Sequence, residues 1–431
     1  MPLRIYYMTF GCKVNQYETD KIAGQFAAGG HLRTDELSEA DVCVINSCTV
    51  TSQADTKLSH FVNRVKRENP KCITVLTGCY PTAFRAEAGK LGCDMYISNK
   101  DKQKIPQIVY DYIDVSYYAA ASIYYDLSPA EQVQTAGQRT RAYIKIQDGC
   151  TLFCTYCIIP YARGKLRSKP LDDIEAEVRG LIAEGYREII LTGINLCCYG
   201  RDLGGKRLID AIERVCSVEG DFRVRLSSME PEMISDKDIA RMAALPKLCP
   251  HFHLSLQSGC DRTLRDMNRH YDTARYLELC EKLRTAFPGC AITTDIMVGF
   301  PGETEQDFAE SLAFAERVGF AQAHIFPYSR RSGTKADTMP GQLTKSEKSV
   351  RAAAMAKVCK GTALRYNESF AGRTVEVLFE REGDKPYHTG HSREYIEVRV
   401  PRSDNETWRR QIKQIRITGA ESDHCTGEEV L

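Results

Sequence analysis

The sequence lacks any long hydrophobic run, any excess of charge of one sign and any low-complexity tract. No apolar stretch approaches the ~20 residues that a membrane-spanning helix needs, so no membrane association is expected. The 58 Lys and Arg residues balance 57 Asp and Glu residues, for a net charge of +1. A polyanionic partner must therefore be bound by local basic patches. The opening MPLRIYYMTF has no basic segment followed by an apolar one, and we expect no secretory signal.

Cysteine, in contrast, is abundant, with 18 residues in a chain of 431. Without a predicted secretory signal, this number indicates reduced thiols in a cytoplasm, where metal binding is more common than disulfides. Cys150, Cys154 and Cys157 have C-x-x-x-C-x-x-C spacing in QDGCTLFCTYCIIP, a pattern that random placement would produce roughly 0.03 times per chain. A closed zinc site takes four ligands, but no Cys or His occurs in the thirty residues that follow.

The first hundred residues alternate between predicted strands and predicted helices. Strands are expected at 4–10, 40–47, 71–77 and 94–98. The helix between the second and third is expected to open with a capping box of Ser52 and Asp55 and to end before Pro70. Such alternation predicts a parallel, doubly wound sheet.

Each of the first three strands runs directly into a cysteine: Cys12, Cys48 and Cys79. Ligands of open α/β sheets bind beyond the carboxyl ends of the strands, so these three cysteines are predicted to converge. The alternative is that they are small buried residues, as we expect for most of the twelve cysteines outside the two sets of three.

Three further segments follow. Residues 101–139 are predicted to form a last helix and a linker. Strands are predicted at 141–147, 187–194, 222–228, 251–257, 291–300 and 322–329, with amphipathic helices between them. Six such units favour a partial parallel barrel over a closed eight-stranded one, and a long basic helix is expected at 343–368. Alternating segments at 373–380, 393–400 and 409–419 predict a small antiparallel β-barrel.

The three-cysteine loop follows the first strand of the predicted barrel, on the face where barrel active sites form. Iron–sulfur clusters normally take four thiolates, so three leave one iron open. Here the sequence resembles the radical S-adenosylmethionine (SAM) superfamily, whose signature CTLFCTYC matches, including Tyr156. The resemblance implies a 4Fe–4S cluster on Cys150, Cys154 and Cys157, with SAM on the open iron and cleaved reductively to a 5′-deoxyadenosyl radical.

The ends of other barrel strands are implied to contact SAM. LTGIN (191–195) resembles the segment that contacts the methionyl amine of SAM in this superfamily. MVGFPGET (297–304) resembles the glycine-containing segment that lies beside the adenine. RLSSMEP and HLSLQSG offer polar side chains, although ordinary turns are the alternative, with Thr304 capping a helix. The residues implied to hold SAM are Tyr156, Thr192, Gly193, Asn195, Ser227, Glu230, Gln257, Gly299 and Gly302.

The three N-terminal cysteine segments, TFGCKVNQYET, NSCTVT and TGCYPT, together resemble the N-terminal domain of methylthiotransferases, and the C-terminal segment resembles a TRAM domain. The resemblance implies a second 4Fe–4S cluster on Cys12, Cys48 and Cys79. It implies an N-terminal domain at 1–115, a linker at 116–139, a radical SAM domain at 140–368 and a TRAM domain at 369–431. One SAM would methylate sulfur carried by the second cluster, and another would supply the radical. No side chain is needed as a general acid or base, so no catalytic residue is assigned.

The sequence around Cys12, TFGCKVNQYET, most resembles that of the threonylcarbamoyladenosine subgroup, the MtaB type. This implies methylthiolation of C2 of N6-threonylcarbamoyladenosine 37 in the tRNA anticodon loop. Alternatives within the family are isopentenyl-adenosine 37 in tRNA or an aspartate of a ribosomal protein. A non-catalytic iron–sulfur or zinc RNA-binding protein is the alternative from another class. An electron-donor protein, a sulfur donor and a cytoplasmic location are also implied.

The terminal domain offers one candidate RNA surface. A stacking and phosphate-binding surface combines an aromatic ring with cations. Residues 370–431 hold ten Lys and Arg against twelve Asp and Glu, so a solvated strand of mixed charge is the alternative. The candidate residues, all in WRRQIKQIR, are Trp408, Arg409, Arg410, Lys413 and Arg416.

Overall fold

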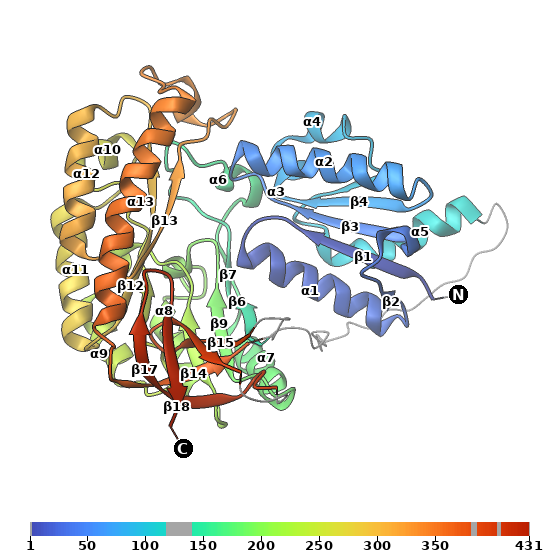
Figure 1. Cartoon of the computed structure of the whole chain (residues 1–431). Helices are drawn as coiled ribbons and strands as arrows, with labels where there is room; N and C mark the ends of the chain where they lie inside the picture. The colour runs from blue at the N-terminus through green and yellow to red at the C-terminus, as the bar shows by residue number, and fades with distance from the viewer. Residues whose placement is uncertain (1, 118–139, 381–385, 403–406, 431) are drawn as a thin grey trace.

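The computed structural model describes residues 2–117, 140–380, 386–402 and 407–430. Figure 1 shows an N-terminal sheet domain, a barrel flanked by long helices, and a small terminal barrel below it. Most of the predicted linker lies outside the described residues, and the helix before it runs to Tyr117. No helix in the described part of the chain is both long and apolar enough to cross a membrane.

The N-terminal domain has a five-stranded parallel sheet of order β2-β1-β3-β4-β5. Helices cover both faces, with α2 on one side and α1 and α5 on the other (Figure 1). Every residue of β3 is therefore buried, and the doubly wound prediction is confirmed, although β2 was not predicted. The elements are β1 (Arg4–Thr9), α1 (Lys13–Ala28), β2 (Leu32–Arg33), η1 (Leu37–Glu39), β3 (Val42–Ser47), α2 (Ser52–Glu68), β4 (Ile73–Gly78), α3 (Cys79–Ala83), α4 (Arg85–Gly89), β5 (Met95–Ile97), η2 (Lys102–Lys104) and α5 (Ile105–Tyr117).

The start of α2 differs from the prediction. Its N-cap is Thr51, whose Oγ1 accepts a hydrogen bond from Ala54 N at 3.3 Å. The Asp55 carboxylate pairs instead with Arg331 of the barrel, at 2.7 Å. A tertiary ion pair thus replaces the local capping box, and the sequence pattern alone does not reveal it.

The central domain is a partial barrel of parallel strands, as predicted. Two three-stranded sheets, β10-β9-β6 and β11-β12-β13, are joined by isolated bridges such as Met229–Leu254. The six strands are β6 (Ala142–Lys145), β9 (Glu188–Thr192), β10 (Arg223–Leu226), β11 (His251–His253), β12 (Ala291–Val298) and β13 (Gln322–Pro327). A short hairpin of β7 (Gln147–Asp148) and β8 (Arg167–Ser168) was not predicted.

Helices surround this barrel and bury its apolar core. Thr304 caps α12 through a capping box with Asp307, so the helix cap given as the alternative role of this segment is present. The helical elements are α6 (Ile159–Arg163), α7 (Leu171–Ala183), η3 (Leu196–Cys198), α8 (Leu208–Cys216), η4 (Pro231–Met233), α9 (Asp236–Ala243), α10 (Asp261–Asp266), α11 (Thr273–Ala286), α12 (Glu305–Val318), η5 (Lys335–Thr338) and α13 (Lys345–Glu368).

The terminal domain is a closed β-barrel of order β14-β15-β16-β18-β17, which confirms the predicted barrel. The β16–β18 pair is parallel, so the antiparallel prediction is wrong for this pair. Two strands were missed, β15 because YHTGHS is mostly polar and β18 because CTGEE is. The strands are β14 (Thr374–Phe379), β15 (Tyr387–Ser392), β16 (Glu397–Pro401), β17 (Ile412–Ala420) and β18 (Cys425–Glu429).

Candidate active site

The barrel cysteine loop, which we define as 149–157, follows β6 and β7 at the carboxyl end of the barrel. Gly149 has φ +77°, and a Cβ there would lie 2.0 Å from Lys165 O, so the turn into the loop requires glycine. Backbone bonds hold the loop: Cys150 N donates to Gly164 O at 3.1 Å, and Thr155 N to Met267 O at 3.0 Å. The loop is therefore built into the barrel rather than free.

The three thiols of this loop lie near enough to influence one another electrostatically. Burial above all, with the neighbouring Cys154 and Cys150 as smaller causes, raises the pKa of Cys157 to about 12. Burial also raises the pKa of Cys150. Thiolates this close are unfavourable unless a positively charged group compensates them, and a metal cluster is such a group. The thiols present therefore fit the iron–sulfur cluster that the motif predicts.

Arg269 is a site residue that the sequence did not reveal. Its Nη1 donates to Cys154 Sγ at 3.3 Å, and its Nη2 pairs with Glu230. Only 3% of its side chain is exposed. An arginine in DRTLRDMNRH carries no local signal for such a role, because the contact joins residues more than a hundred positions apart.

The N-terminal cysteines also come together. A Cβ on Gly11 would lie 2.6 Å from Cys48 Cβ, and one on Gly78 would lie 2.2 Å from Ser47 O. The segments that carry Cys12 and Cys79 thus both pack against the one that carries Cys48. Burial raises the pKa of Cys48 to about 11, with Cys79 and Cys12 as further causes. Cys12, Cys48 and Cys79 therefore lie in neighbouring segments, and a shared cluster stays a prediction. Of the twelve cysteines outside the two sets, ten are buried, as expected.

Neither set surrounds a single point. Among the described residues, no three Cys, His, Asp or Glu side chains are placed to hold one metal ion. In a 4Fe–4S cluster each thiolate binds a different iron, so the sulfurs lie further apart than the ligands of one ion.

Unpaired polar atoms mark the predicted SAM site. Ser227 Oγ, Gln257 Oε1 and Asn195 Oδ1 are buried without a hydrogen-bond partner among the described residues. Gln257 also has a strained φ of +66°. Buried polar atoms are normally paired, and a polar ligand beyond these strand ends would pair them. The three residues thus fit a bound cofactor such as SAM.

The other residues predicted to contact SAM differ in whether their surroundings leave room for a ligand. The Glu230 carboxylate is already paired with Arg269. A Cβ on Gly299 would lie 2.5 Å from Lys348 Cγ, whereas Gly302 faces open space. Of the rest, Thr192 is buried at the end of β9, and a Cβ on Gly193 would lie 3.0 Å from Gln147 Cβ. The ring of Tyr156 lies edge-on to that of Phe300, with 6.5 Å between the ring centres.

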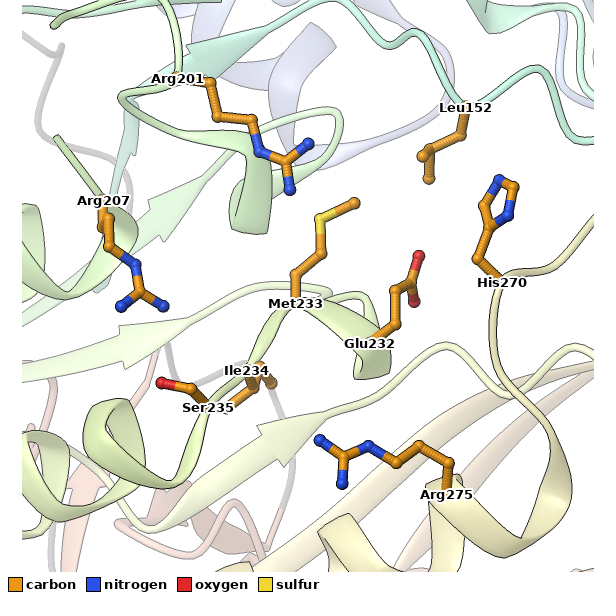
Figure 2. Close-up of a pocket in the computed structure, with 9 residues that line it drawn as sticks. All are labelled: Leu152, Arg201, Arg207, Glu232, Met233, Ile234, Ser235, His270 and Arg275. Carbon is orange, nitrogen blue, oxygen red and sulfur yellow. The ribbon is translucent and has the colours of Figure 1, made fainter. Parts of the chain in front are cut away.

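A cavity of about 520 Å³ adjoins the barrel cysteine loop at Leu152. Figure 2 shows arginine side chains and His270 around Glu232 and Met233. None of the predicted SAM contacts lines it. Its lining residues are Leu152, Arg201, Arg207, Glu232, Met233, Ile234, Ser235, His270 and Arg275.

Comparison with known proteins agrees with this geometry. The radical SAM superfamily matches residues 144–315, and uncharacterized protein family UPF0004 matches residues 4–98. The threonylcarbamoyladenosine tRNA methylthiotransferase MtaB of Thermotoga maritima is 36% identical over 392 residues, or 90% of this chain and 89% of that one. The chain belongs to the radical SAM methylthiotransferase family. The predicted enzyme class and the predicted cofactors, 4Fe–4S clusters and SAM, are thereby confirmed.

A second tRNA-modifying enzyme and a solved structure are also similar to this chain. The tRNA-2-methylthio-N(6)-dimethylallyladenosine synthase of Caldicellulosiruptor saccharolyticus is 37% identical over 390 residues, or 87% of this chain and 82% of that one. The radical SAM methyltransferase TsrM of Kitasatospora setae has a TM-score of 0.56 at 12% identity, covering 78% of this chain and 77% of that one. The last shows a shared fold alone.

In this methylthiotransferase, a buried charge network joins the N-terminal domain to the barrel. The Glu18 carboxylate of α1 accepts from Lys145 Nζ and Arg163 Nη1, each at 2.8 Å, and pairs with Lys102. Burial alone would raise the pKa of Glu18, but the three cations hold it well below its usual range. Arg163 ends α6, which packs against α3, the helix that begins at Cys79. The network therefore lies between the two cysteine sets.

The terminal barrel does not present the predicted stacking ring. Trp408 is only 6% exposed and stacks on His388 at 4.0 Å inside the barrel. It is therefore not available to an RNA base, and that part of the prediction is wrong. Lys413 pairs with Glu429, Arg416 with Glu428, and Arg410 lies over the Tyr186 ring. For Arg409, Arg410, Lys413 and Arg416, phosphate binding stays a prediction.

Proposed function

We propose that this protein methylthiolates C2 of N6-threonylcarbamoyladenosine 37 in tRNA. The observation that carries the proposal is the pair of three-cysteine sets, one in the barrel and one beside it in the N-terminal domain. Each set leaves one iron of a 4Fe–4S cluster without a protein ligand. The relatives named above, which modify tRNA by their printed names, support the substrate class.

The residues of this chain bind and position, and none acts as a general acid or base. SAM on the barrel cluster supplies radical chemistry, which an aromatic C–H bond requires. Cys150, Cys154 and Cys157 hold the barrel cluster, and Arg269 donates to one of these sulfurs. Asn195, Ser227 and Gln257 bind the polar groups of SAM, and Cys12, Cys48 and Cys79 hold the cluster that carries sulfur.

The proposal includes partners and a location. SAM cleavage consumes an electron and methylthiolation consumes sulfur, so we infer an electron-donor protein and a sulfur donor. The substrate is an anticodon loop, whose unpaired bases are accessible to side chains. We place the reaction in the cytoplasm, where tRNA is found.

Isopentenyl-adenosine 37 is a second candidate substrate, because a dimethylallyladenosine synthase is as similar to this chain as the MtaB protein is. Mass spectrometry of tRNA nucleosides from cells with and without the gene separates the two. We expect loss of 2-methylthio-N6-threonylcarbamoyladenosine and accumulation of its unthiolated precursor. Loss of the methylthio isopentenyl nucleoside would assign the second candidate, and an unchanged profile would contradict tRNA as substrate.

Ser227→Ala tests the SAM site. Its hydroxyl has no partner among the described residues, so its removal should leave the free energy of unfolding unchanged or slightly higher. SAM should bind about tenfold more weakly, since one hydrogen bond is worth ~1.4 kcal/mol. Equilibrium dialysis of iron-loaded protein measures the affinity. Ser217→Ala is the control, because Ser217 is an exposed serine directly after α8. Unchanged affinity would remove Ser227 from the site.

A further inference from the structure

One short segment of the barrel contacts both cysteine loops. This bridge segment, 329–336, follows β13, the last barrel strand. At one end Ser329 and Arg331 bind the N-terminal residues just after Cys48. At the other end Ala336 N donates to Thr155 O, inside the barrel cysteine loop, at 2.8 Å. Only four residues of backbone, 332–335, separate the contact with the Cys48 loop from the contact with the barrel cysteine loop.

Arg331 makes the strongest of these contacts. Its Nε and Nη2 donate to Thr49 O at 2.8 and 2.6 Å, and Nη2 also reaches Thr51 O at 2.9 Å. Its Nη1 lies 2.7 Å from Asp55 Oδ2. The side chain is 5% exposed, so these charge-assisted bonds form away from water, where they are strong. Ser329 adds a 3.0 Å bond from Ser52 N to its Oγ.

The contacts of Arg331 affect Cys48, a predicted cluster ligand, through Val50. Val50 N donates to Cys48 Sγ at 3.5 Å. Val50 lies between Thr49 and Thr51, whose carbonyl oxygens Arg331 binds on both sides. The Thr49 C=O and the Val50 N–H belong to one planar peptide group, so the guanidinium that binds Thr49 O also fixes where the Val50 N–H points, and its bond to Thr51 O holds the next turn of the loop. Hydrogen bonds to cluster sulfurs help to set a cluster's reduction potential, so this geometry bears on the chemistry of the site.

We propose that Arg331 is a positioning residue for sulfur transfer: from the barrel, it fixes the Cys48 loop relative to the barrel cysteine loop and orients the Val50 N–H toward Cys48. The turnover part of this proposal rests on the proposed function. In this proposal Arg331 contacts neither SAM nor substrate, and it acts only through the Cys48 loop. A misplacement of about 1 Å is enough to lower a rate about a hundredfold.

Arg331→Ala separates positioning from general stability. The variant should keep its barrel cluster and cleave SAM at the wild-type rate. The yield of methylthio nucleoside per 5′-deoxyadenosine should fall about tenfold to a hundredfold. Arg330→Ala is the matched control, because the adjacent Arg330 is 58% exposed and pairs with Asp337 within the barrel. An unchanged yield in Arg331→Ala would overturn the proposal.

Two readouts do not depend on turnover. Hydrogen–deuterium exchange at 49–56 should be faster in Arg331→Ala than in Arg330→Ala. In full-length protein with Cys150, Cys154 and Cys157 all changed to Ala, the reduction potential of the remaining cluster, followed by electron paramagnetic resonance, should shift with Arg331→Ala only. Unchanged exchange and an unchanged potential would overturn the positioning role even if the yield fell.

Arg331→Lys adds a rescue test. Lysine keeps the charge beside Asp55 but lacks the planar fork whose three nitrogens bind Thr49, Thr51 and Asp55 together. The yield and exchange rate should therefore lie between those of wild type and Arg331→Ala. Should Arg331→Ala not fold, Arg331→Lys replaces it, and a wild-type yield there would overturn the proposal. If wild type itself formed no methylthio nucleoside, the proposed function would fail, while exchange and potential would still report on Arg331.

Discussion

Cys48→Ala is expected to abolish methylthio transfer while sparing part of the SAM cleavage, whereas Cys150→Ala should abolish both. The reason is the separation of the two sets: Cys48 follows β3 in the N-terminal domain, and Cys150 lies in the barrel cysteine loop. With two thiolates remaining, the affected cluster should be lost or unstable. The other set, in its own domain, should keep its iron.

Three quantities check this expectation for the purified, iron-loaded protein: iron per chain, 5′-deoxyadenosine formed, and methylthio nucleoside formed. Cys72→Ala is the matched control, because Cys72 is a buried thiol of the same domain outside both sets. Full methylthio product from Cys48→Ala would show that the N-terminal cysteines do not hold a sulfur-carrying cluster. SAM cleavage surviving Cys150→Ala would disprove the assignment of the barrel cluster.

Glu188→Gln is expected to destabilise the protein by about 3–5 kcal/mol, because it leaves buried cations without a counter-charge. Glu188 in β9 is fully buried. Its carboxylate accepts from Arg223 Nε at 2.6 Å and Arg225 Nε at 2.9 Å. The same arginines donate to backbone oxygens of His391 and Ser392, so the network also joins the barrel to the terminal domain. Urea unfolding at neutral pH measures the loss.

The contribution of Glu188 to the free energy of unfolding should fall as the pH is lowered. Burial alone would raise the pKa of Glu188, but Arg225 and Arg223 hold it well below its usual range. A carboxyl group with a lowered pKa stabilises the fold above its unfolded pKa of about 4.3, and this contribution is lost as the pH falls toward the folded value. The wild type should therefore lose more stability on acidification below about pH 4.5 than Glu188→Gln does.

Glu175→Gln is the control for this substitution. Glu175 forms exposed ion pairs with Arg179 and Arg214, and such pairs add little stability. Equal unfolding curves for Glu188→Gln and wild type at neutral pH would show that the buried network does not stabilise the fold.

Much of the fold follows from local patterns in the sequence. All six barrel strands lie within the segments that the sequence predicted, although β13 is partly exposed and β10 buries Arg223 and Arg225. Polar strands escaped prediction: β15 and β18 pair within a closed barrel, where neighbouring strands rather than local composition decide. The N-cap of α2 is Thr51 rather than the predicted Ser52 for a similar reason, since Asp55 pairs with Arg331 of the barrel.

The sequence by itself determined the two cysteine sets, the family and the class of chemistry, because a short spacing such as C-x-x-x-C-x-x-C reports a cluster without any knowledge of the fold. Only the tertiary structure decided which charges serve the site. It brought Arg269 to Cys154, Glu18 to the cations between the domains and Arg331 to the Cys48 loop, and it buried Trp408. These contacts join residues up to 282 positions apart, and their strength comes from exclusion of water, which the folded chain alone creates.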